Sequence, residues 1–425
     1  MHVATADLTG VTYGDSGSRP GIRVASVDFV RGVAMILMAI DHVRIYAGIP
    51  VDGTFGFFYT RWITNFVAPT FVFLAGTAIY LRGRKLNDKA DLSMFLLTRG
   101  LWLVLLEMTV IRLAWTFNLD FAHYLLAGVI WMLGWCMVLM AALVRLPVVF
   151  HAIAGTAIIA LHNLTNLFQQ PITHFFEDGG PNWILKLIYF GGAIDLGTTG
   201  PPLMILYVIV PWIGLMMVGY AFGVVVEMPR ERRTRLCLKL GAGLTLLFIL
   251  LRAVDVYGDP RPWRIKPASQ PSGQTSANAA IAPRPTTPAT RRFLNTTKYP
   301  ASLLFLLMTI GPMLLLLALA EHAGGRAAGI ITTFGRVPML YYLLHLPVIH
   351  VAACIVSGIR EGQVNPWLFE NHPLAASWPP PYRWSLGLMY LVYVICLIVL
   401  YFPCKRFAEL RAKRHSAWLS YFSNS

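Results

Sequence analysis

The chain has 425 residues, of which 56% are hydrophobic and only 13% are charged, and its formal net charge at pH 7 is +15. This composition excludes an ordinary soluble domain and predicts an integral membrane protein. In such a protein an excess of lysine and arginine marks membrane topology, so no nucleic-acid partner is expected.

Segments of about 17 to 25 largely apolar residues are long enough to cross a bilayer as helices. Ten such segments follow one another along the chain: 27–48, 58–81, 94–115, 122–144, 148–168, 203–226, 235–257, 300–319, 328–357 and 384–402. We therefore predict an all-α fold, a polytopic transmembrane bundle of about ten helices.

The connections between these segments differ in charge. Every even-numbered connection is basic, as at 82–89 and 230–235, whereas short odd-numbered loops such as 49–57 contain aspartate and neither lysine nor arginine. Cytoplasmic loops of membrane proteins carry the excess of basic residues. Both termini are therefore predicted to face the cytoplasm.

Five regions are predicted along the chain. They are a disordered cytoplasmic tail at 1–22, seven helices within 23–257, a disordered extracytoplasmic loop at 258–299, three helices within 300–403 and a basic cytoplasmic tail at 404–425. The loop is expected to be disordered because its proline, alanine, serine and threonine content cannot form a core.

The first apolar segment carries charged groups near both of its ends. Asp28 and Arg31 are three residues apart near its start, so they can pair on one helical face, and Asp41 and His42 lie near its end. Charge inside a spanning segment is costly, so each such group is a hypothesis for a functional site. A carboxylate beside an imidazole suits proton transfer at neutral pH, and we predict that His42, oriented by Asp41, is a catalytic base.

The other polar residues of the predicted membrane part fall at two levels. The outer level supplies candidates for binding an acceptor or an oxyanion: Arg44, Arg61, Asn65, His345 and Arg252. The inner level supplies candidates for binding an anionic cofactor: Arg31, Arg82, Arg84, Lys85, Arg99 and Arg336. This layout suits a protein that binds an anionic molecule on the inside and performs chemistry near the outside.

Some of these residues also have a purely structural explanation. Arg252 lies three residues before Asp255, so the two can form a structural ion pair. Gly76, inside the second apolar segment, is expected to allow close helix packing.

A metal site is a competing explanation for Asp41, His42 and His345, which could supply three ligands. No HExxH or comparable spacing supports such a site, and the five cysteines are scattered without a CxxC pair. We predict that the site contains no metal.

Two other classes of protein remain open. A transporter, or a lipid or glycan flippase, could use the outer polar cluster as a proton relay. The chain lacks a detectable internal repeat, which many secondary transporters have. A membrane scaffold without catalytic activity is the third class.

Five sequence blocks resemble a known family. They read SVDFVRGVAMILMAIDHVRIY, FVAPTFVFLAGTAIYL, VYGDP, KYPASLLFLLMTIGPMLL and FGRVPMLYYLLHLPVIH. Together they resemble bacterial membrane proteins of the heparan-alpha-glucosaminide N-acetyltransferase family, and the resemblance extends from about residue 23 to residue 414.

The resemblance implies an acyltransferase in the lipid of the bacterial inner membrane. Such an enzyme would transfer an acetyl or other acyl group from cytoplasmic acetyl-CoA to an extracytoplasmic acceptor, a sugar amine or hydroxyl. The inner basic residues would then hold the CoA phosphates, because arginine binds oxyanions bidentately. Homo-oligomer formation is left open.

The resemblance has one departure. The lysosomal enzyme of the family is similar but has an asparagine at the position of His42, with its catalytic histidine farther on, in the first outer loop. Here the corresponding loop, 47–60, contains no histidine. Either His42 serves as the base, or this branch of the family differs in acceptor and mechanism.

Overall fold

The computed structural model describes residues 24–48, 55–86, 88–122, 124–168, 182–197, 200–264, 287–370 and 382–413. The predicted tail at 1–22 and the end of the chain at 414–425 lie outside these residues.

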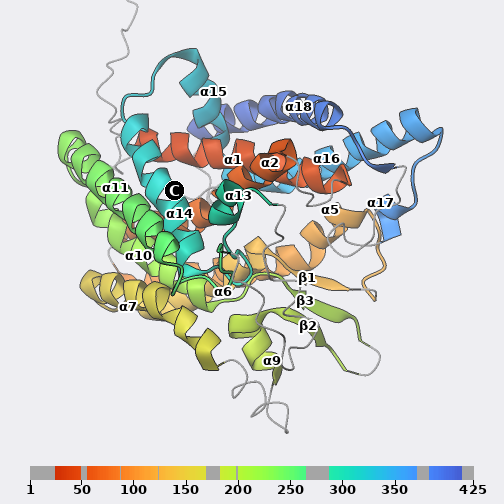
Figure 1. The fold of residues 1–425 in the computed structure, drawn as a ribbon. Helices are drawn as coiled ribbons and strands as arrows, with labels where there is room; N and C mark the ends of the chain where they lie inside the picture. Colours follow the sequence, from red (N-terminus) through yellow and green to blue (C-terminus); the bar gives the residue numbers. More distant parts are fainter. Residues whose placement is uncertain are drawn as a thin grey trace, which may run out of the picture.

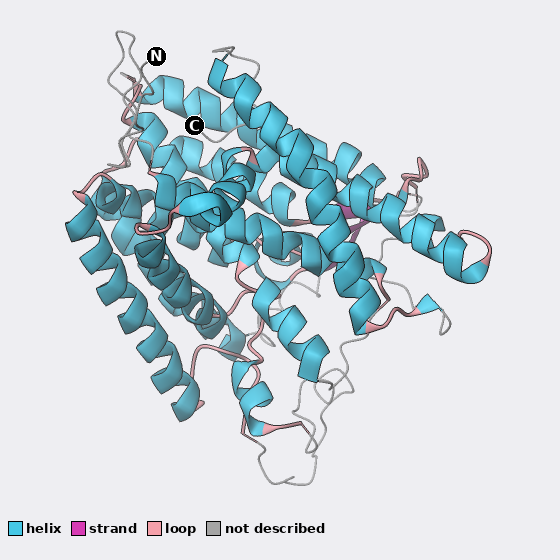
Figure 2. Cartoon of the chain, turned by 90° about the horizontal axis from the view of Figure 1, so that it is seen from above, coloured by secondary structure: helices cyan, strands magenta, loops and turns pink. Residues whose placement is uncertain are grey.

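The described residues are mostly helical, with only short strands (Figure 1, Figure 2). The helices are α1 (Ala25–Tyr46), α2 (Phe55–Thr64), α3 (Val67–Gly83), α4 (Lys89–Leu106), η1 (Glu107–Ile111), α5 (Arg112–Thr116), α6 (Val129–Leu143), α7 (Val148–Leu161), η2 (His162–Phe168), α9 (Asn182–Leu185), η3 (Lys186–Phe190), α10 (Val210–Val226), α11 (Arg230–Val254), α13 (Ala289–Leu294), α14 (Leu303–Ala320), α15 (Gly325–Arg336), α16 (Pro338–Glu361), α17 (Trp367–Glu370) and α18 (Leu386–Lys413).

Seven helical segments of the described chain are long and apolar enough to cross a membrane. Two shorter apolar helices, α6 and α10, accompany them. Helix α1 is 22 residues long and also carries charged residues near both ends. The prediction of a mostly helical membrane protein is confirmed, whereas the number of ten spans and the cytoplasmic termini stay predictions.

Several predicted helices are divided or begin differently in the structure. The segment 58–81 is divided between α2 and α3. The segments 122–144 and 203–226 begin as strands β1 (Leu125–Ala127) and β3 (Pro202–Ile205), which pair in parallel, and β2 (Gly192–Asp195) pairs antiparallel with β3. The segment 328–357 is two helices, α15 and α16, with non-helical backbone angles at Val337. The break has a local cause: Pro338 lacks an N–H group and disfavours helical angles in the residue before it.

Helix α1 lies at the centre of the bundle. It contacts α2, α3, α14, α15, α16 and α18, and Figure 1 shows it running alongside α16 and below α18. It approaches α15 closely because glycines meet at the crossing: a β-carbon on Gly32 would collide with the carbonyl oxygen of Ile331, and one on Gly335 with that of Asp28. Small residues permit such close contact between membrane helices.

The remaining helices pack around this centre in pairs. Helix α3 packs on α10, α10 on α7, α4 on α6, and α11 on α14. A β-carbon on Gly76 would collide with the carbonyl oxygen of Met216 in α10, so the predicted packing role of Gly76 is confirmed.

The predicted disordered loop at 258–299 is described only at its two ends. Its middle, 265–286, lies outside the described residues. The flanks at 258–264 and 287–299 pack on the bundle and include helix α13. At the other predicted boundary, α18 continues to Lys413, so residues 404–413 extend a helix instead of starting a tail.

Candidate active site

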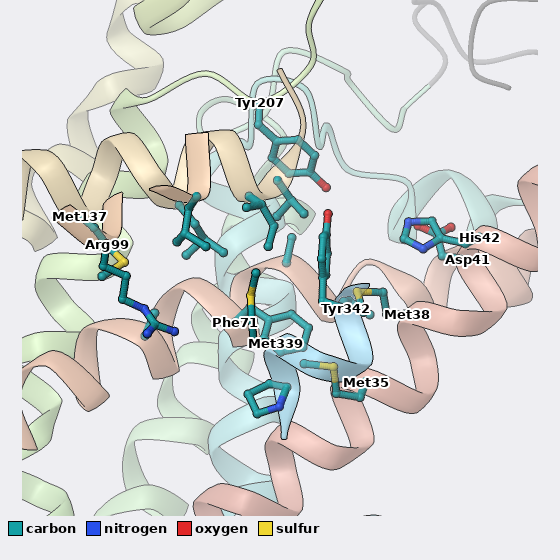
Figure 3. A pocket seen from close by; sticks show the side chains of 18 of the residues that line it. Met35, Met38, Asp41, His42, Phe71, Arg99, Met137, Tyr207, Met339 and Tyr342 are labelled. Atoms are coloured by element: carbon teal, nitrogen blue, oxygen red, sulfur yellow. The ribbon is translucent and has the colours of Figure 1, made fainter. Parts of the chain in front are cut away.

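A cavity of about 110 Å³ lies inside the bundle (Figure 3). Most of its wall is apolar and comes from α1, α3, α4, α6 and α16. Its polar lining residues are Asp41, His42, Arg99, Tyr207, Lys298 and Tyr342. A mostly apolar pocket with a few convergent polar groups is the usual form of a small-molecule site.

The cavity has chemically different ends. In Figure 3, Asp41 and His42 of α1 lie at one end and Arg99 of α4 lies at the other, with Met38 and Phe71 among the side chains between them. A second, smaller cavity of about 30 Å³ shares Ala75, Arg99 and Met137 with the first and adds Arg82 of α3. The two cavities therefore adjoin, with His42 lining the first and Arg82 lining the second.

His42 is hydrogen-bonded to a second histidine. Its Nδ1 lies 2.7 Å from Nε2 of His345 in α16, and Nδ1 of His345 lies 2.6 Å from the carbonyl oxygen of Tyr342. A carbonyl oxygen can only accept, so Nδ1 of His345 carries a proton and Nε2 of the neutral ring accepts from His42 Nδ1–H. This assignment leaves the lone pair of His42 on Nε2, where it can accept a proton.

Asp41 does not orient His42, contrary to the prediction. Its Oδ1 accepts hydrogen bonds from Arg44 Nη2 at 2.9 Å and from Thr64 Oγ1 at 3.0 Å. Successive residues on a helix do not face each other, whereas residues three apart do. Asp41 therefore pairs with Arg44, and the partner that positions His42 is His345.

Lys298 is a site residue that the sequence did not single out. It lines the cavity and interacts electrostatically with Asp41 and His42. It lies in the segment that was expected to be a disordered loop. The available signal was its place at the start of the block KYPASLLFLLMTIGPMLL, one of the five that carry the family resemblance.

The position of Lys298 is set by hydrogen bonds to the residues around it. The carboxylate of Asp259 accepts from the Thr297 backbone N–H at 2.8 Å, from Thr297 Oγ1 at 2.9 Å and from Ser302 Oγ at 2.7 Å. Nearby, the Leu303 N–H donates to Asn163 Oδ1 at 2.8 Å. The bonds to Asp259 tie the VYGDP and KYP blocks together. The C-terminal end of the predicted loop is therefore held against the bundle, where Lys298 lines the cavity.

Glu107 is a second residue that the sequence analysis missed. It is 2% exposed, and its Oε2 accepts the backbone N–H groups of Ile130 at 2.9 Å and Trp131 at 3.2 Å. These are unsatisfied donors of the first turn of α6, so Glu107 caps that helix from another element. Val129 and Ile130 are thereby fixed in the cavity wall.

The six inner basic residues divide into two groups. Arg99 lines both cavities and Arg82 lines the smaller one, and both guanidinium groups lie over the ring of Phe95, at 5.8 and 3.6 Å from its centroid. The others line neither cavity: Arg31, Arg84, Lys85 and Arg336. Arg31 instead binds Asp28 at 3.1 Å, as the three-residue spacing allows, and Arg84 binds Glu227 at 3.1 Å.

The outer candidates also separate. None of the five lines the main cavity. His345 is hydrogen-bonded to His42, Arg44 is hydrogen-bonded to Asp41, and Arg61 interacts electrostatically with Asp41. Arg252 has a structural role. It is 1% exposed, and its guanidinium donates to four backbone carbonyl oxygens, those of Arg261, Arg292, Phe293 and Asn295.

The part of the chain that the structure describes contains no group of three or more His, Cys, Asp or Glu side chains placed to hold a metal ion. His42 and His345 form a pair, and Asp41 is directed toward Arg44 and Thr64.

A protein-family model described as "Heparan-alpha-glucosaminide N-acetyltransferase, catalytic" matches residues 23–251, more than half of the chain. A search of curated proteins with the same chain found no match. The matched stretch contains His42, Arg82 and Arg99, and it ends before Lys298 and His345.

Proposed function

The chain belongs to the heparan-alpha-glucosaminide N-acetyltransferase family, a family of transmembrane acetyltransferases, and from this premise we propose that it transfers an acyl group from cytoplasmic acyl-CoA to an acceptor across the membrane. The observation that carries the proposal is the pair of adjoining cavities, the first lined by His42 and Arg99 and the second by Arg99 and Arg82. One end has a base and the other has the groups that an anionic donor needs.

The donor would enter from the end with the two arginines. Arg82 and Arg99 would bind CoA phosphates, because a planar guanidinium matches two oxyanion oxygens at once. The apolar wall between the ends, which includes Met35, Met38 and Phe71, suits the pantetheine arm and its thioester. The acyl group would then lie beside His42.

The acceptor would bind at the end with His42, Lys298 and Asp41. We expect a sugar amine or hydroxyl, as the family resemblance implies. The acceptor lone pair forms a bond to the thioester carbonyl carbon while His42 Nε2 takes the acceptor proton. The carbonyl oxygen carries the negative charge until the C–S bond breaks, and CoA leaves as a thiolate that can take the proton from His42.

His345 would act through His42. Its Nε2 accepts the His42 Nδ1–H bond, which holds the ring with Nε2 as the basic atom. Direct transfer by this mechanism requires both substrates to be bound at the same time.

The first test uses purified protein in detergent with radiolabelled acetyl-CoA and a panel of amino sugars from cell envelopes. We expect saturable binding of acetyl-CoA and label in at least one sugar. A protein that binds no acetyl-CoA and labels no sugar would contradict the proposal.

The histidine pair also suits a second function, a proton-coupled transporter. Two hydrogen-bonded imidazoles inside a membrane bundle can pass a proton. This alternative gives no reason for affinity toward acetyl-CoA, so the same binding measurement separates the two functions.

A further inference from the structure

Two tyrosine hydroxyls face each other across the main cavity. Tyr207 comes from the segment between β3 and α10, and Tyr342 comes from α16. Figure 3 shows the two hydroxyls pointing toward one another between Arg99 and His42, and the two side chains interact electrostatically. Each residue is only 7% exposed, so both hydroxyls lie in a largely apolar interior.

Both hydroxyls have a proton available for a ligand. Tyr299 Oη donates to Tyr207 Oη at 3.3 Å, so Tyr207 accepts this bond and keeps its own proton. Among the described residues, the hydroxyl of Tyr342 makes no hydrogen bond to protein. A phenol stays protonated at neutral pH and is therefore a donor.

The residues first considered for the oxyanion do not line the main cavity: Arg44, Arg61, Asn65, His345 and Arg252. Arg252 donates to backbone carbonyl groups, and Arg44 is bound to Asp41. His345 uses both ring nitrogens, one toward His42 and one toward its own helix. The lining residue Lys298 interacts electrostatically with Asp41, and its ammonium group lies 5.3 Å from the centroid of the Tyr299 ring.

We propose that the hydroxyls of Tyr207 and Tyr342 form the oxyanion hole of this enzyme. The inference rests on the proposed acyl transfer. As the acceptor lone pair forms its bond to the thioester carbon, the C=O π pair moves to oxygen, and the two O–H groups donate to it. When this pair returns, the C–S bond breaks and CoA leaves as thiolate. Neutral donors held in an apolar site stabilise such charge strongly.

The test compares Tyr207→Phe and Tyr342→Phe with wild type in the acetyl-transfer assay. Each variant keeps the ring and removes one hydroxyl, and we expect kcat to fall about 10²-fold while KM for acetyl-CoA is unchanged. Tyr341→Phe is the matched control. Tyr341 is the neighbour of Tyr342 in the chain. Its hydroxyl is buried and lacks a hydrogen-bond partner among the described residues, and Tyr341 does not line the cavity.

The outcomes separate this inference from the proposed function. If wild type transfers acetyl groups and both Phe variants keep its kcat, or change only KM, the tyrosines are not the oxyanion hole and the acyltransferase assignment stands. If wild type binds acetyl-CoA and transfers nothing to any acceptor, both are overturned. A kcat loss in Tyr341→Phe equal to that of Tyr342→Phe would also contradict the inference.

Discussion

The two ends of the cavity system are built in different ways. At the His42 end, α1, α16 and the segment before α14 each contribute a different functional group. At the other end, Arg82 of α3 and Arg99 of α4 lie over one ring, that of Phe95. Under the proposed function, the first end moves protons and the second binds the anionic donor. Variants at the first end should therefore change kcat, and variants at the second should change donor binding.

The largest effect is expected at His42. His42→Ala removes the base, and we expect kcat to fall about 10²- to 10⁴-fold with acetyl-CoA binding unchanged, measured by labelled transfer and equilibrium binding. His151→Ala serves as the control, because this buried histidine lines neither cavity, and its ring packs against Tyr220. Wild-type activity in the His42 variant would remove it from the mechanism.

The next effect tests the other end. Arg99→Met should weaken acetyl-CoA binding by about 10- to 100-fold, because a hydrogen bond to a charged group contributes about 1.5 to 3 kcal/mol. At saturating donor its kcat should match wild type. Arg84→Met is the matched control, since Arg84 binds Glu227 and lines neither cavity. Equal donor affinity in both variants would refute the division between the ends.

A smaller effect is expected for the residue that positions His42. His345→Phe removes the acceptor for His42 Nδ1–H, and the loss of one hydrogen bond, about 1 kcal/mol, should lower kcat roughly fivefold to tenfold. The pH profile of kcat should shift as well, because the tautomer of His42 is no longer held. His345→Gln can accept the same bond and should recover part of the activity. If His345→Phe weakened acetyl-CoA binding and left kcat unchanged, His345 would belong to the donor-binding end with Arg99 and Arg82.

The smallest effect lies outside both ends, at Glu321. Burial raises the pKa of this carboxyl, but hydrogen bonds from Arg233 and Ser26 and the charges of Arg233 and Arg230 outweigh burial and hold the pKa below its usual range. A depressed pKa contributes stability that is present above the pKa of the unfolded state and is lost as pH falls through the pKa of the folded state.

The melting temperature of the wild type should therefore decrease on acidification below the ordinary glutamate pKa. Glu321→Gln should show less of this dependence, at unchanged kcat under neutral conditions. Differential scanning fluorimetry across pH measures both proteins. Identical pH dependence in the two proteins would show that Glu321 does not contribute.

The sequence alone determined the protein class and the first residues to test. The length and composition of the apolar segments predict the helical bundle, because a segment that spans the bilayer needs a long apolar run whichever helices it packs against. The polar and charged residues inside the first apolar segment pointed to His42, because placing such groups in a membrane-spanning segment costs free energy. The family resemblance added the donor, and two of the six inner residues, Arg82 and Arg99, border the cavities.

Only the tertiary structure decided which groups meet. His42 and His345 are 303 residues apart in the chain, and the bond between them depends on the packing of α1 against α16. The same holds for Lys298, which Asp259 helps to hold at the cavity, and for the pair Tyr207 and Tyr342. Arg252 is a charged residue within an apolar segment, which made it a candidate for the site, but its role is structural. Its guanidinium donates to backbone carbonyl groups that the fold brings around it, and sequence spacing does not predict these partners. Local sequence determines where helices form and where burying a charged side chain costs free energy. Which side chains meet across helices depends on how those helices pack.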